Sequence, residues 1–172
     1  MNASTSNHRA RDASESGIVL EFASRLAAPQ SQVFATLTEA DRLTRWFCDR
    51  AESEPRAGGS IVLGWTLADV MDRPFTGKWT SFVPVETCAY RGGHAGYPGD
   101  DAGLVEFVLQ PGFHDVALNE KPLCSTALIV RHTFPDGPDF ESFVATYATA
   151  WPRALARLEA LLALSTLTEH RS

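Results

Sequence analysis

The segment FESFVATYATAWPRALARLEALLAL, residues 140–164, places apolar side chains at the spacing of an amphipathic helix. The positions that share this stripe are Phe140, Phe143, Val144, Tyr147, Trp151, Leu155, Leu158 and Leu162. Pro152 lies inside the segment and cannot donate a hydrogen bond to the carbonyl of Ala148, so we expect a bend there. A long helix is therefore expected over about 140–164, and its apolar stripe must be buried against another layer.

Upstream of this segment, short apolar runs alternate with polar residues, which is typical of strands. The runs lie at 18–26, 60–66, 75–83, 85–91, 104–110 and 125–134. Between the first two runs, Pro29 is tolerated in the first turn of a helix and is followed by helical spacing. Two short helices are therefore expected at about 30–38 and 39–47.

The order of these elements predicts the fold class. Consecutive strands without crossover helices imply an antiparallel meander. A strongly curved sheet that grips one helix leaves a space between the two layers. We therefore expect an α+β fold in which a curved antiparallel sheet wraps around a long C-terminal helix, with two short helices after the first strand and a cavity inside.

The length of 172 residues suits one domain. Residues 1–16 are rich in Ser, Asn, Asp and Arg without periodicity, and we interpret them as a flexible tail. The folded domain is expected over residues 17–166, and residues 167–172 are expected to form a short C-terminal tail.

Composition excludes several classes of function. The net charge of −6 makes the chain a poor candidate for binding the phosphates of nucleic acid. No apolar run approaches the ~18 residues that a membrane helix needs, so no insertion into a membrane is expected. The polar N-terminus lacks the apolar core of a signal peptide, and a cytoplasmic protein is therefore expected.

Metal, cofactor and nucleophile signals are missing from the sequence. The three cysteines, Cys48, Cys88 and Cys124, are widely separated, and no two histidines stand at metal-ligand spacing. The glycines at 93, 96 and 99 superficially resemble a phosphate loop, but strands flank them where such a loop needs a following helix. No serine nucleophile motif is present. We therefore expect no metal and no cofactor, and the sequence identifies no catalytic residue.

Four stretches of the chain match a family pattern in their order. They are APQSQVFATLTEADRLTRWF (28–47), AGGSIVLGW (57–65), GKWTSFVPVETCAY (77–90), and ALIVRHTFPDG followed by YATAWPRALARLEALL (127–162). Together they resemble the SRPBCC superfamily, and most closely its bacterial homologues of the heat-shock-protein ATPase activator. The resemblance implies the helix-grip fold of START domains and polyketide cyclases. The chain departs from the pattern in the loops 92–103 and 111–123, whose role the sequence does not reveal, and in Tyr147, where relatives often carry histidine.

Side-chain alternation along strands and helical spacing place seven residues on the surfaces that face the expected cavity. These candidate ligand-binding residues are Leu63, Trp65, Phe107, Val130, His132, Tyr147 and Trp151. His132 has two interpretations, either a group that binds ligand or moves a proton, or a hydrogen-bonded structural histidine that faces the last helix. Tyr147 and Trp151 are suited either to stacking on a flat ligand or to core packing.

Three functions follow as hypotheses. The preferred one is binding of a small hydrophobic or aromatic molecule in the cavity. The second is an enzyme of the cyclase or dehydratase type with His132 or Tyr147 as acid or base. The third, a co-chaperone-like protein-interaction module, is implied only by the name of the resembled family. The sequence leaves monomer and dimer equally open.

Overall fold

The computed structural model describes residues 17–67, 70–71, 74–94, 101–112 and 125–169. The expected tail at 1–16, the central parts of the loops 92–103 and 111–123, and residues 170–172 of the expected C-terminal tail lie outside the described residues.

Seven strands form one sheet in the order β1-β9-β8-β7-β6-β3-β2. Their bounds are β1 Ile18–Leu26, β2 Arg50–Ser53, β3 Ser60–Gly64, β6 Phe75–Val83, β7 Thr87–His94, β8 Leu104–Pro111 and β9 Thr126–Phe134. Two short strands, β4 (Thr66–Leu67) and β5 (Val70–Met71), form a separate hairpin. Every neighbouring pair in the seven-stranded sheet is antiparallel, which confirms the expected meander.

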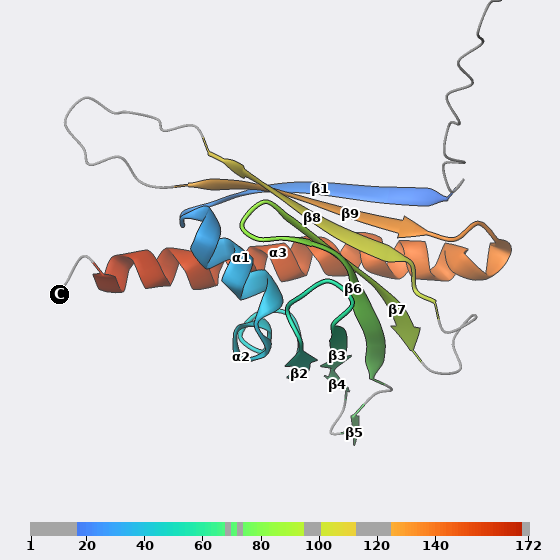
Figure 1. The fold of residues 1–172 in the computed structure, drawn as a ribbon. Coiled ribbons are helices and arrows are strands. Elements are labelled where there is room, and N and C mark those ends of the chain that lie inside the picture. The colour runs from blue at the N-terminus through green and yellow to red at the C-terminus, as the bar shows by residue number, and fades with distance from the viewer. Residues whose placement is uncertain (1–16, 68–69, 72–73, 95–100, 113–124, 170–172) are drawn as a thin grey trace, which may run out of the picture.

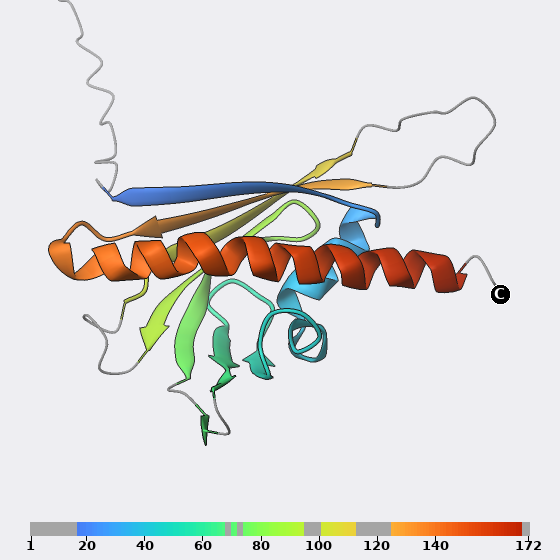
Figure 2. The ribbon, with the colours of Figure 1, turned by 180° about the vertical axis from the view of Figure 1, so that it is seen from behind.

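The helices cover one side of this sheet. α1 (Gln30–Thr38) and α2 (Ala40–Leu43) follow β1, and a 3-10 turn (Pro138–Phe140) leads from β9 into α3 (Glu141–Glu169). α3 runs the length of the sheet, while α1 and α2 lie at one end (Figures 1 and 2). The α+β helix-grip architecture expected from the sequence is therefore confirmed.

Several elements differ from the sequence expectation. The hairpin of β4 and β5 was not expected, and α3 continues to Glu169, beyond the expected end at about residue 164. The second helix ends at Leu43 instead of about residue 47, because the N–H groups of residues 46, 47 and 48 all converge on the Leu43 carbonyl and close the helix. β2 was not expected, since Ala51 is the only apolar residue of its RAES segment. Val85 begins no strand: its φ of 72° places it in the turn between β6 and β7.

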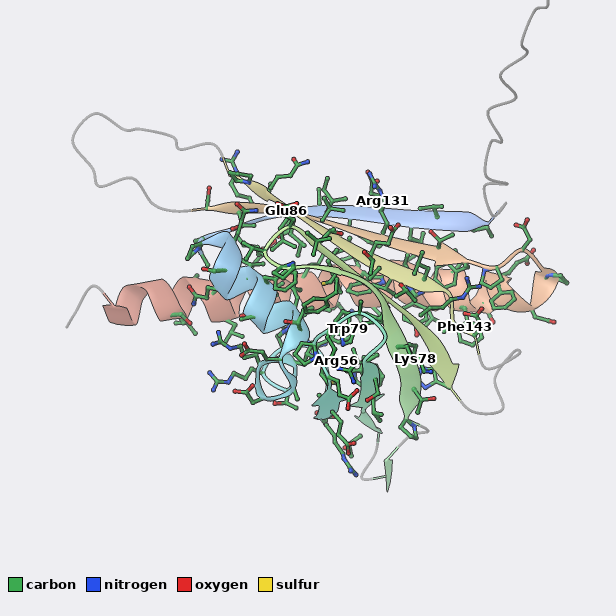
Figure 3. The ribbon with its side chains drawn as sticks, viewed as in Figure 1. Arg56, Lys78, Trp79, Glu86, Arg131 and Phe143 are labelled. Carbon is green, nitrogen blue, oxygen red and sulfur yellow. The ribbon has the colours of Figure 1, made fainter. Side chains whose placement is uncertain are left out.

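The core lies between the sheet and the helices and is rich in tryptophan. Trp46, Trp79 and Trp151 are each at most 2% exposed, and Trp79 lies within the body of the molecule (Figure 3). Their indole N–H groups donate to the Thr36 carbonyl, the Ser53 hydroxyl and the His132 ring respectively. Because a buried indole N–H needs an acceptor, these bonds fix the orientation of each ring.

Candidate functional site

Trp151 lies where α3 meets the sheet. Its ring stacks on Phe47 at a centroid distance of 5.4 Å and meets the edge of Phe107 at 6.0 Å. Phe47 follows α2 and Phe107 belongs to β8, so the contact joins three parts of the fold. The sequence places Trp151 and Phe107 on facing surfaces, and the structure brings them into contact.

His132 on β9 is held by hydrogen bonds at both ring nitrogens. The Trp151 indole N–H donates to Nδ1 at 3.1 Å, and Nε2 lies 2.7 Å from the Ala102 carbonyl oxygen. Since Nδ1 accepts, the ring proton is on Nε2 and is donated to Ala102. Burial lowers the pKa of His132 from 6.5 to about 4, against a smaller raising effect of the bond to Ala102, so the imidazole is neutral near pH 7. These contacts favour the structural interpretation of His132.

Tyr147 packs across the end of this histidine. Its ring meets the His132 ring edge-on at 4.6 Å, and His132 in turn stacks on Phe134 at 3.9 Å. Tyr147 is partly buried, and burial raises the pKa of its phenol. Tyr147 precedes Trp151 by one helical turn, so both project from the same stripe of α3.

Trp65 reaches the same aromatic group through Phe47. Its indole N–H donates to the Phe47 carbonyl at 2.8 Å, and its ring meets the Phe47 ring at 5.7 Å and the His94 ring at 6.0 Å. Phe47 therefore connects Trp65 with Trp151. The position of Phe47 depends on the path of the chain beyond Leu43, where α2 ends, and helical spacing does not set it.

Leu63, Phe107 and Val130 belong to the buried face of the sheet, and each is at most 2% exposed. Phe107 lies directly opposite Val130 across the β8–β9 pair, while Leu63 lies opposite Phe75 on the β3–β6 pair. The seven predicted residues are thus gathered in or against one interior, with Leu63 among its aliphatic members. That they enclose space for a ligand stays a prediction.

Tyr90 on β7 is a member of this interior that the sequence did not single out. Its ring meets Phe75 and Trp79 at 5.5 Å and Phe107 at 6.1 Å, and only 4% of the residue is exposed. No described residue forms a hydrogen bond with its hydroxyl. Only the alternation of Cys88 and Tyr90 along β7 could have indicated the inward position.

The Tyr90 phenol is strongly desolvated. Burial raises the pKa of its phenol well above 10, and the nearby Tyr147 phenol and the Cys48 and Cys88 thiols raise it further. Both phenols are neutral at physiological pH.

The cysteines are unsuited to nucleophilic chemistry. Cys48 and Cys88 are buried, and desolvation is the main cause that raises their pKa values to about 11 and about 12. Cys124 lies outside the described residues. Within the described ranges, no three His, Cys, Asp or Glu side chains gather as metal ligands. No helix in the described part of the chain is long and apolar enough to span a membrane.

Comparison with known proteins shows the family to which most of the chain is similar. Residues 27–163 match the family model described as Activator of Hsp90 ATPase homolog 1-like protein. No curated protein matches the chain in sequence.

Similar solved structures share the fold. Protein MLL2253 from Mesorhizobium loti is 20% identical, with a TM-score of 0.67 over 85% of this chain and 97% of that one. The Aha1 dimer from Colwellia psychrerythraea is 18% identical, with a TM-score of 0.62 over 84% and 96%. DynU16, described as a putative protein in the dynemicin biosynthetic locus, is 20% identical, with a TM-score of 0.66 over 84% of this chain and 47% of its own.

Proposed function

We propose that this chain, which belongs to the Activator of Hsp90 ATPase homolog 1-like family, binds a small, flat, uncharged molecule between the sheet and α3, with a polar atom of the ligand bonded to Tyr90. The proposal deepens what the fold alone implies, namely a protein of the SRPBCC type with a ligand-binding architecture.

The observation that carries the proposal is the Tyr90 hydroxyl. Buried polar groups in native proteins nearly always have a hydrogen-bond partner, and leaving one unmade costs about 1–3 kcal/mol. The hydrogen bonds of the described residues include none from the Tyr90 hydroxyl, and the fully enclosed side-chain atom without a partner among these residues is Ser125 Oγ, not Tyr90. The Tyr90 ring is contacted by Phe75, Trp79 and Phe107, so its hydroxyl is held in place and open to a further partner. A ligand oxygen or nitrogen that enters the interior would provide it.

The walls of the interior set the class of ligand. Aromatic rings dominate the side that faces α3, where Phe47, Phe107, Tyr147 and Trp151 lie, and they offer stacking surfaces to a flat molecule. No Asp, Glu, Lys or Arg is among the buried residues of the described part of the chain. Because an unpaired charge is expensive to bury, the interior favours a neutral ligand.

The enzyme alternative receives less support from this geometry. His132 would have to release Trp151 or Ala102 before it could exchange a proton with a substrate, and its neutral form is favoured down to about pH 4. Burial raises the pKa of the Tyr147 phenol, so the phenol stays protonated near neutral pH and is a weaker acid than a free tyrosine. The occurrence of DynU16 in a biosynthetic locus is compatible with binding of a small molecule as well as with catalysis.

The co-chaperone alternative has no continuous apolar patch to support it among the described residues. The exposed large apolar side chains there are Ile18, Val19, Val83 and Leu164, which lie at the start of β1, the end of β6 and the last part of α3. Isolated apolar residues of this kind are normal on a protein surface.

A matched pair of probes tests the proposal. 2-Naphthol and 2-methylnaphthalene have the same flat rings, but only the first can hydrogen-bond to Tyr90. Isothermal titration calorimetry should show that the wild-type protein binds both and prefers 2-naphthol. Tyr90→Phe should lower the affinity for 2-naphthol by up to about tenfold and leave the affinity for 2-methylnaphthalene unchanged. The substitution removes one neutral hydrogen bond and keeps the ring.

Thr146→Val is the matched control, since it removes an exposed hydroxyl from α3 and should leave both affinities unchanged. Failure of the wild type to bind either probe would contradict the binding function. If a folded Tyr90→Phe protein lost the same factor of affinity for both probes, the assigned role of the hydroxyl would be contradicted.

A further inference from the structure

The strand β1 forms one edge of the seven-stranded sheet, and it is long. It spans nine residues, whereas β2 at the opposite edge spans four. A long edge strand presents a row of backbone N–H and C=O groups that can pair with another strand, and short edge strands limit that hazard. β1 lies at the outer side of the sheet in both ribbon views (Figures 1 and 2).

Side chains of β1 alternate between two environments. Ser24 faces inward, where its hydroxyl donates to the Glu159 carboxylate on α3. The residues of the other face, Val19, Glu21, Ala23 and Arg25, are all exposed. On this outer face, Glu21 and Arg25 lie two residues before and two residues after Ala23.

That arrangement is complementary to itself. Two copies of β1 can run antiparallel with Ala23 of one opposite Ala23 of the other. In this register Glu21 of each copy lies opposite Arg25 of the other. We propose that β1 pairs with β1 of a second copy of this chain in this register, which gives a symmetric dimer with one continuous sheet. The proposal is independent of the ligand that the interior takes.

Glu21 already accepts a hydrogen bond from Arg131 and can accept another from Arg25 of the second copy. Arg131 on β9 donates from Nε to Oε2 of Glu21 at 2.7 Å, on the outer side of the sheet (Figure 3). A carboxylate can accept hydrogen bonds at both oxygens, so Oε1 can serve Arg25 of the second copy. Arg25 already has an interaction within its own chain, and the five N–H donors of a guanidinium let it keep that interaction while it donates to Glu21 of the other copy. In the dimer each Glu21 would lie between two guanidinium groups.

A groove beside β1 gives the second copy an apolar contact as well. It has a volume of about 430 Å³, and Phe22, Ala23, Pro152, Leu155 and Ala156 form its apolar part, with the acidic residues Glu21 and Glu159 also in its lining. In the proposed register, Phe22 of the second copy is the diagonal neighbour of Phe22, within the reach of aromatic side chains across a strand pair. Pairing would therefore cover the open side of the groove with an aromatic ring.

Sedimentation velocity over a range of protein concentrations tests the dimer. Ala23→Lys places two lysines opposite each other at the symmetry axis and should weaken dimerisation by about five- to tenfold. Thr76→Lys is the control, because Thr76 is exposed on the internal strand β6, and it should leave the dimer unchanged. A wild type that stays monomeric at every concentration, or a dimer that Ala23→Lys leaves intact, would overturn the proposal.

Charge exchange tests the register. Glu21→Arg and Arg25→Glu should each weaken the dimer, and the double variant should restore it, because the opposite charges then face each other again. Failure of the double variant to restore association would overturn the register. Protection of the β1 amides from hydrogen exchange in a monomer, lost on deletion of residues 1–16, would overturn the dimer and identify that segment as the occupant of the edge.

Discussion

A buried histidine that uses both ring nitrogens is fixed in one tautomer as well as one orientation. His132 accepts from Trp151 and donates to Ala102, so it joins β9 to α3 and to the residue that precedes β8 by two positions. At 2% exposure the ring has almost no water to solvate a positive charge. Protonation would also convert the Nδ1 acceptor into a donor that faces another donor.

The pH dependence of stability follows from this site. The folded pKa of about 4 lies below the unfolded value of 6.5, so the unfolded chain takes up the proton first as the pH falls. The stabilisation of the folded protein by neutral His132 is complete above pH 6.5 and is lost as the pH falls to about 4. It amounts to about 3 kcal/mol of the free energy of unfolding. Urea unfolding between pH 7 and pH 4 should show a steeper loss for the wild type than for His132→Gln, which keeps one donor and one acceptor. Parallel curves for the two proteins would contradict the assignment.

At the scale of secondary structure, the turn between β6 and β7 stores strain. Val85 has a φ of 72°, which a β-branched residue rarely adopts. Its carbonyl accepts from the Gln30 amide at the start of α1, and the same amide also reaches the Leu109 carbonyl. The contacts around the turn hold Val85 in a conformation that glycine would adopt at lower cost.

Val85→Gly should therefore raise the free energy of unfolding by about 1 kcal/mol, since relief of the left-handed conformation exceeds the entropy that glycine loses on folding. Val83→Gly is the control, because Val83 lies at the end of β6 and its φ is not positive. That substitution should destabilise the protein slightly. Thermal unfolding of the two variants compares them directly, and a lower melting temperature for Val85→Gly than for the wild type would refute the strain argument.

The same turn shows where local sequence patterns stop being sufficient. Alternating apolar residues predicted β1 and β6 with the bounds that the structure has, because each strand has one buried face that fixes the pattern. Val85 was expected in a strand because it is apolar and β-branched, and its turn conformation is imposed by neighbours distant in sequence. β2 was missed because its pairing with β3, not its own composition, makes it a strand.

At the scale of the whole molecule, aromatic contacts join elements that are far apart in sequence. Phe47 links Trp65 on one side with Trp151 of α3 on the other, and Trp151 contacts Phe107 on β8 and His132 on β9. The sequence could place Trp65, Phe107, His132 and Trp151 on inward faces, because alternation and helical spacing are local properties. It could not predict that Phe47 lies between two of them, since that depends on the path of the chain after α2.

The hydrogen bond between Trp151 and His132 joins α3 to β9, the strand next to the sheet edge, and a double-mutant cycle can measure it. Trp151→Phe removes the donor and keeps a stacking ring, and His132→Phe removes the acceptor. Each single variant leaves one buried polar group without its partner, whereas the double variant leaves neither member of that pair. The double variant should therefore be less destabilised than the sum of the two singles, by about 1–2 kcal/mol in urea unfolding.

The matched control for this cycle combines His132→Phe with Trp79→Phe. The indole of Trp79 is also buried and hydrogen-bonded, but to Ser53 on β2, so it shares no bond with His132. Those two substitutions should add to within about 0.5 kcal/mol, as expected for sites without a common partner. Additive behaviour in both cycles would contradict a specific link through Trp151. Coupling in the Trp151 cycle only would show that one directed bond helps to fix the position of the helix, and with it the spacing between Tyr147 and Tyr90 on which the proposed ligand site depends.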